Sequence, residues 1–262
     1  CAMAVFTSNL GLNDTFIGSA AADTFNFTVL DLTSGDTLTG AGGTDTLVLT
    51  GAGAVAAPSL AGLTSIEALV YGNGGISVTF SNAAALANAA TLVVTGSTGN
   101  DTLDYSAVTN AGRAFVINAG AGVDTLRGGA GNDTFRFAAA NLAGDTIAGG
   151  TGSDTLQVST VGVLAANALT NMSRVETIAL AAGTNGVTLV NGNFTGVAGA
   201  KITVYGSTGA DTIDASGVTG ANAVEFRSGG GVDVLRGGAG ADAFRFNAAD
   251  IDGDTLAGGG GN

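Results

Sequence analysis

The stretch Gly128-Gly129-Ala130-Gly131-Asn132-Asp133-Thr134-Phe135-Arg136 decides the fold of this chain. It follows the pattern G-G-x-G-x-D-x-U-x, in which U is a large apolar residue. Glycine readily enters left-handed backbone conformations, so the first half of the stretch predicts a tight turn. The second half predicts a short strand whose central side chain points inward. Residues 149–157 and 237–245 match the same pattern in full.

This nine-residue pattern lies inside a much longer repeat. Gly-Asp-Thr occurs at 35–37, 144–146 and 253–255, each copy 109 residues after the previous one. Residues 96–102 return in nearly the same order as 206–212. Repeats of this kind predict a solenoid, because each unit must bury its apolar face against its neighbours. We therefore expect one continuous segment over 1–262, made of long repeats 36–144 and 145–253 with partial units 1–35 and 254–262.

The turn residues indicate a calcium site. Glycine turns direct carbonyl oxygens into the turn, and carbonyl and carboxylate oxygens are the ligands that Ca²⁺ takes about six to eight at a time. Thirteen of the 18 Asp residues occupy the repeat position, so we expect several Ca²⁺ ions as cofactors. The expected carboxylate ligands are Asp14, Asp23, Asp36, Asp45, Asp101, Asp124, Asp133, Asp145, Asp154, Asp211, Asp233, Asp242 and Asp254. The expected carbonyl ligands lie around Gly128, Gly129, Gly131, Gly149, Gly150, Gly152, Gly237, Gly238 and Gly240.

Two plainer interpretations of these residues compete with a metal site. Gly and Asp also form the turns of ordinary hairpin proteins, and acidic residues can simply keep a surface soluble. Fixed spacing across two long repeats favours the metal site over both.

The spacing of the aspartates predicts the architecture. Two turn-and-strand units close one coil of about 18 residues, and successive coils stack as parallel strands. Coils here carry about three to five residues more, because the repeat aspartates recur every 21 to 23 residues. The fold class expected is all-β, a right-handed parallel β-solenoid with stacked calcium-binding turns. Further strands are expected at 46–49, 68–71, 76–80, 92–94 and 202–205, whereas 82–90 and 191–196 are expected to be loops at a corner.

Register follows from the same count. If Asp101 stacks on Asp124, then Asp104 must lie beside Arg127 on the next strand. By the same count, if Asp211 stacks on Asp233, then Asp214 must lie beside Arg236. We expect the best calcium site between Asp133 and Asp154, since both follow the full glycine pattern.

Composition excludes several classes of function. The net charge of −13 disfavours nucleic acid, which is recognised by clustered Lys and Arg. The chain has no His and a single Cys, which removes the usual zinc sites, a disulfide framework and histidine as a general base. No apolar run is long enough to span a membrane. Parallel β-helices also house polysaccharide-cleaving enzymes, but the acidic pair Asp250 and Asp252 is better interpreted as extra calcium ligands or solvated charge, so we expect no enzyme.

The turns resemble those of RTX proteins, which Gram-negative bacteria export by type I secretion. The resemblance rests on the three full motifs, on 5–7 through 13–16 and 22–25, on the 35–38 to 45–47 block, and on the matching strand entries 65–67 and 174–176. The wider pattern is most similar to RTX-type surface-layer proteins and giant repeat adhesins. The resemblance implies a secreted structural protein of a bacterial surface or matrix, which folds on Ca²⁺ outside the cell and assembles with copies of itself. The alternative that it implies is the calcium-binding module of a secreted enzyme, toxin or adhesin whose active part lies elsewhere.

Overall fold

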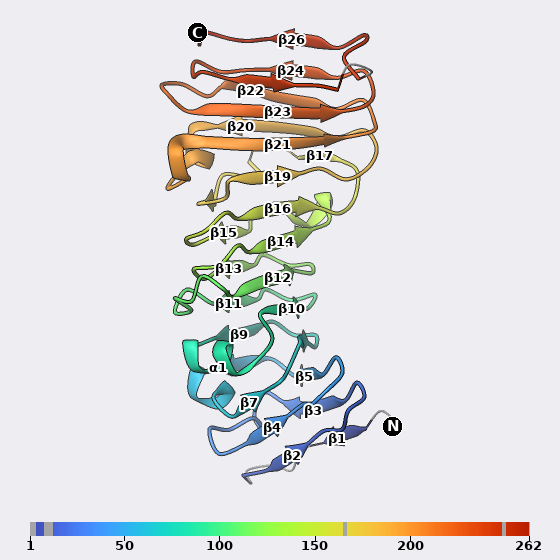
Figure 1. Ribbon diagram of the computed structural model, residues 1–262, viewed down its shortest axis with the longest axis vertical. Coiled ribbons are helices and arrows are strands. Elements are labelled where there is room, and N and C mark those ends of the chain that lie inside the picture. Colours follow the sequence, from blue (N-terminus) through green and yellow to red (C-terminus); the bar gives the residue numbers. More distant parts are fainter. Residues whose placement is uncertain (1–3, 8–12, 165–166, 248–249, 262) are drawn as a thin grey trace. The chain divides into compact units, whose positions relative to one another are not determined.

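The computed structural model describes residues 4–7, 13–164, 167–247 and 250–261. The chain forms two compact units, one of Cys1–Asp133 with Gly150–Gly152 and the other of Thr134–Gly149 with Ser153–Asn262. In each unit parallel strands stack as the rungs of a β-solenoid (Figure 1). The predicted all-β parallel solenoid is thereby confirmed for each unit, while its continuity over 1–262 stays a prediction.

The first unit contains parts of three parallel sheets. The largest has the order β1 (Val5–Thr7), β3 (Thr24–Thr28), β5 (Thr46–Thr50), β8 (Ala68–Tyr71), β10 (Thr91–Thr95) and β12 (Ala114–Asn118). The other two have the orders β6 (Gly53–Val55), β9 (Ile76–Thr79), β11 (Thr102–Asp104), β13 (Thr125–Arg127), and β2 (Thr15–Ile17), β4 (Thr37–Thr39), β7 (Leu63–Thr64). Its helices are η1 (Ala57–Leu60) and α1 (Asn82–Ala87).

The second unit is built in the same way. Its largest sheet has the order β14 (Thr134–Phe137), β16 (Thr155–Val158), β19 (Thr177–Ala179), β21 (Lys201–Ser207), β23 (Ala223–Gly229) and β25 (Ala243–Arg245). A second sheet has the order β17 (Val163–Leu164), β20 (Gly186–Val190), β22 (Thr212–Gly217), β24 (Val234–Arg236) and β26 (Thr255–Ala257), and β15 (Thr146–Ala148) pairs with β18 (Met172–Ser173). Its 3-10 helices are η2 (Ala139–Asn141), η3 (Asn191–Phe194) and η4 (Ala198–Ala200).

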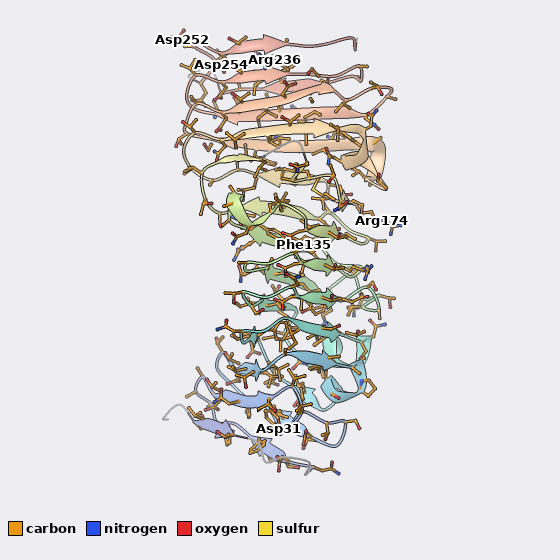
Figure 2. The ribbon with its side chains drawn as sticks, turned by 180° about the vertical axis from the view of Figure 1, so that it is seen from behind. Asp31, Phe135, Arg174, Arg236, Asp252 and Asp254 are labelled. Carbon is orange, nitrogen blue, oxygen red and sulfur yellow. The ribbon has the colours of Figure 1, made fainter. Side chains whose placement is uncertain are left out.

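Alternation along each strand produces the core. In β5, Leu47 and Leu49 are fully buried, and the residues between and beside them are not. Phe135, the apolar residue of the deciding motif, is also fully buried (Figure 2). Side chains on a strand point alternately to its two faces, so one face of every rung fills the interior and the other faces outward.

The predicted register is confirmed in both long repeats. Asp104 lies opposite Arg127 on β11 and β13, and Asp214 lies opposite Arg236 on β22 and β24. The guanidinium and carboxylate atoms are 3.4 Å apart in the first pair and 3.5 Å apart in the second. Exposed ion pairs contribute only about 0–1 kcal/mol, so these pairs report the register more than they stabilise it.

The two expected corner loops are wrong. The first contains the helix α1, and the second contains the 3-10 helix η3. Ser81 caps α1 by accepting a hydrogen bond from the Ala84 amide, and Ala84 is fully buried. Asn193 plays a related part in η3, where its side chain accepts from the Val190 amide at 2.7 Å. Local capping and burial of the corner therefore outweigh the poor helix propensity of 191–196.

Candidate metal centre

Aspartates at the turns connect each coil to the one before it. Oδ1 of Asp45 accepts a hydrogen bond from the Asp23 amide at 2.7 Å, although these residues are 22 positions apart. We call this series of bonds the carboxylate ladder. The same bond joins the Asp14 amide to Asp36, the Asp101 amide to Asp124, the Asp211 amide to Asp233 and the Asp233 amide to Asp254, each at 2.8 Å. The predicted stacking of Asp101 with Asp124 and of Asp211 with Asp233 is thus present.

Two glutamates extend the ladder. Glu67 accepts from the Asp45 amide at 2.8 Å, and Glu176 accepts from the Asp154 amide at 2.9 Å. Neither glutamate was expected to take part in the turns, because both lie outside the glycine pattern. A signal was present nonetheless, since each follows a repeat aspartate by 22 residues and the two are 109 residues apart.

One class of turn is closed by its own carboxylate. In these closed turns, Oδ2 of the aspartate accepts a hydrogen bond from the amide four residues earlier. Asp101 accepts in this way from Ser97 at 2.7 Å, and Asp211 accepts from Ser207 at 2.7 Å. The other closed turns of this kind end at Asp23, Asp133 and Asp242, whereas Oδ2 of Asp36 accepts from the Thr33 amide, three residues earlier. Both carboxylate oxygens therefore have amide donors in a closed turn, since Oδ1 accepts from another coil.

A second class of turn has left-handed residues four and two positions before the aspartate. In these open turns the values of φ are 73° at Ala41 and 108° at Gly43 before Asp45. They are 84° at Gly229 and 112° at Gly231 before Asp233. The turns before Asp124 and Asp154 have the same two left-handed positions. A residue in the left-handed conformation points its backbone N–H in a different direction from the residue at the same position of a closed turn. This N–H therefore does not bond to the carboxylate.

Two of the open turns leave a buried carboxylate oxygen without a donor among the described residues. Among the described residues, Oδ2 of Asp45 and Oδ2 of Asp233 have no hydrogen-bond partner although both side chains are fully buried. Oδ2 of Asp254 and the hydroxyl of Ser228 are also buried without a partner. A buried anionic oxygen that lacks a donor is costly, so each of these positions favours a cation.

Burial and hydrogen bonding shift the pKa values of these groups in opposite directions. The amides of Ser19 and Ala4 lower the pKa of Asp23. Burial raises the pKa of Asp133 to about 6 and outweighs the two amides that donate to it. Burial also raises the pKa of Asp45, and it raises the pKa of Asp233, where the Asp211 amide counteracts only part of the rise.

These donors fit calcium. Carboxylate, hydroxyl and carbonyl oxygens are hard ligands, and Ca²⁺ accepts an irregular arrangement of them. No group of three or more Asp, Glu, His or Cys side chains gathers to hold a metal in the part of the chain that the structure describes. A calcium site there would therefore take its remaining ligands from backbone carbonyls. The pairing of Asp133 with Asp154 stays a prediction, because Asp133 belongs to the first unit and Asp154 to the second.

Without calcium, the stability of the fold is expected to fall as the pH rises from about 4 to 7. An acid whose pKa is raised in the folded state stabilises that state below its unfolded pKa and loses this contribution as the pH rises through the folded value. For Asp133 the effect is on the order of 3 kcal/mol between about pH 4 and 6. Asp45 and Asp233 act in the same direction. Decalcified protein should therefore keep more of its β-sheet circular dichroism signal at pH 5 than at pH 7.

The stability that the decalcified protein gains at pH 5 should be lost again in stronger acid. The pKa of Glu225 is lowered to about 2 by its hydrogen bonds with Arg227 and Lys201, so its contribution is lost as the pH falls from about 4.5 toward 2. Asp133→Asn should flatten the profile between pH 5 and 7, and calcium-loaded protein should show the reverse slope because protons compete with the ion. A flat profile for the decalcified parent chain would contradict the assignment.

Comparison with known families identifies the turns. The RTX calcium-binding nonapeptide repeat matches four times, at residues 116–141, 140–157, 203–217 and 225–247. The chain therefore contains RTX repeats, and RTX repeats bind calcium. No curated protein and no solved structure gives a match. Among the described residues, no helix is long and apolar enough to cross a membrane.

Proposed function

We propose that this chain is a calcium-dependent structural segment of a bacterial surface or extracellular matrix, without catalytic activity of its own, that folds on Ca²⁺ outside a Gram-negative cell. The observation that carries this proposal is the stacking of open turns on closed ones. Asp233 lies on Asp211 in this way, with a buried oxygen that has no donor among the described residues. Calcium would neutralise that oxygen, and the closed turn beneath would hold the carboxylate in place.

Extracellular conditions suit such sites. Modules outside the cell bind calcium with constants of about 10⁻⁴ to 10⁻³ M, close to the concentration of calcium there. A site at ten times its dissociation constant gains about 1.4 kcal/mol, and several sites together reach about 5 to 10 kcal/mol. That sum is comparable to the whole stability of a domain. In the cytosol the gain disappears, so the same chain would stay unfolded until export.

Two substitutions separate a metal ligand from a structural acceptor. Asp233→Asn should lower the calcium stoichiometry by about one, because the uncompensated oxygen becomes a weaker ligand. Asp211→Asn should instead keep the stoichiometry and lower the stability of the calcium-loaded protein, because Asp211 accepts from Asn185 at 2.8 Å and from Ser207 at 2.7 Å. Titration calorimetry gives the stoichiometry, and urea unfolding gives the stability.

Asp252→Asn is the matched control, because the exposure of Asp252 favours solvated charge over a calcium ligand and the substitution removes the same charge (Figure 2). It should leave both quantities unchanged. If the Asp233→Asn variant kept the full calcium stoichiometry, the open turns would not belong to the calcium site. For the surface role, imaging of the native assembly with and without chelator should show order that depends on calcium, and an assembly indifferent to chelator would argue against that role.

A further inference from the structure

One outward-facing row of the second unit differs from the rest of this acidic chain. Tyr205 on β21 lies opposite Arg227 on β23, and Arg227 lies opposite Arg245 on β25. The Arg227 guanidinium also lies over the Tyr205 ring, 5.2 Å from its centroid. The chain has only eight Lys and Arg residues, so two arginines beside an exposed tyrosine form an unusual local surface.

A single glutamate organises this surface. Glu225 is almost completely buried although it projects from the outer face of β23. Its carboxylate accepts from Arg227 Nε at 2.8 Å, and it pairs with Arg245 Nε at 2.8 Å and with Lys201 Nζ at 3.1 Å. A terminal nitrogen of Arg227 also pairs with the carboxylate at 2.7 Å. Glu225 thus holds both guanidinium groups in place, although the side chains of Arg227 and Arg245 remain exposed.

The solenoid does not need this cluster. At the corresponding positions of the first long repeat, Lys201, Tyr205, Glu225 and Arg227 are replaced by Thr91, Thr95, Val116 and Asn118. The strands there, β10 and β12, pair in the same parallel register as β21 and β23. The inward residues of these strands are apolar in both repeats, so the difference on the outer face requires another explanation than folding.

A hollow of about 290 Å³ lies against this row. Its lining residues are Tyr205, Gly206, Arg227, Gly229, Arg245, Phe246, Asn247 and Asp250. Two of these are glycines, which have no side chain to fill the space. The volume is at the small end of the range for ligand pockets, about 300–1,000 Å³, so it suits one ring-sized group.

The charges around the hollow favour a singly charged anion. Lys201, Arg227 and Arg245 carry three positive charges against the two negative charges of Glu225 and Asp250, so one net positive charge remains. A planar guanidinium matches a carboxylate with two parallel hydrogen bonds. The second negative charge of a phosphate would be repelled by the carboxylates of Glu225 and Asp250.

The remaining lining residues favour a sugar ring as the carrier of that carboxylate. Tyr205 and Phe246 contribute aromatic side chains to the lining. Asn247 donates to Asp250 at 2.9 Å, and the oxygen atoms of the two side chains can accept from hydroxyl groups. We propose that this hollow binds a carboxylate-bearing sugar unit, such as a uronic acid of an acidic polysaccharide.

The test uses the full chain, saturated with calcium, and follows binding by NMR titration. Methyl glucuronoside is the probe, and methyl glucoside is its neutral match. The glucuronoside should bind and the glucoside should bind at least about tenfold more weakly, since hydrogen bonds to a charged group are lost. Arg227→Asn combined with Tyr205→Thr should weaken glucuronoside binding by a similar factor. These are the residues of the first repeat, so the variant keeps side chains that the solenoid already accommodates.

The control is Arg136→Ala, because Arg136 occupies in the first repeat the position of Arg245 and bonds to Gln157 at 2.7 Å. Binding should be unchanged in this variant, and circular dichroism should show that both variants are folded. Equal binding of the two glycosides would overturn the proposal. So would unchanged binding in the double variant, or binding of inorganic phosphate in preference to the glucuronoside.

Discussion

Chelation of calcium should remove most of the β-sheet circular dichroism signal of this chain, and added calcium should restore it. Without the ion, the net charge of −13 is uncompensated. Buried oxygens of Asp45 and Asp233 then have neither a cation nor a donor among the described residues. The loss expected from several sites, about 5 to 10 kcal/mol, is comparable to the stability of a whole domain.

Magnesium at the same concentration is the control, because Mg²⁺ demands a compact octahedral arrangement and gives up its water reluctantly. It should restore little of the signal. A spectrum that is indifferent to chelator would mean that the apolar interior alone maintains the fold. In that case the open turns would not be sites of stabilisation.

Gly206→Ala should lower the free energy of unfolding by about 3 kcal/mol. A Cβ on Gly206 would lie within 2.8 Å of two backbone atoms of Ser228 and 3.0 Å from Oδ2 of Asp211. Well-packed sites accommodate added atoms only by shifting the backbone, which costs about 1–3 kcal/mol. Here the shift would also strain the bond between the Asp211 amide and Asp233. Urea unfolding of the calcium-loaded protein measures the loss.

Gly192→Ala provides the comparison. Nothing lies within 4 Å of the position of its Cβ, and the residue does not have a left-handed conformation. Alanine there should leave stability unchanged or raise it by about 0.4–1 kcal/mol. Equal effects of the two substitutions would show that the coils are not in close contact at Gly206.

The register could be predicted because it follows from counting. A slip of one residue would turn every apolar side chain outward, so the spacing between Asp101 and Asp124 determines where Asp104 and Arg127 meet. The same reasoning predicted most strands, since alternation and turns both appear in the sequence. The helices α1 and η3 were missed because capping by Ser81 and Asn193 depends on how the corner is buried.

The difference between closed and open turns could not be predicted from the motif. Gly129 and Gly150 occupy the same place in two full copies of it. Yet Gly129 donates its amide to Asp133, whereas Gly150 is left-handed with φ of 113°. The Thr151 amide, next to Gly150, bonds to the Gly129 carbonyl at 3.0 Å. Both positions are glycine, so the residue type does not distinguish the closed turn from the open one. The open conformation of Gly150 instead occurs together with the contact to the adjacent coil.

All bonds of the carboxylate ladder run in one direction, from the amide of an earlier coil to the carboxylate of a later one. The Asp101 amide, for example, bonds to an acceptor 23 residues further along the chain. A polypeptide that emerges amino-terminus first from a ribosome or a narrow channel would therefore expose each turn before its acceptor arrives. Completion of the fold lags behind emergence by one coil. A chain that emerges carboxy-terminus first would present every acceptor before its donor, so the two directions of emergence are not kinetically equivalent.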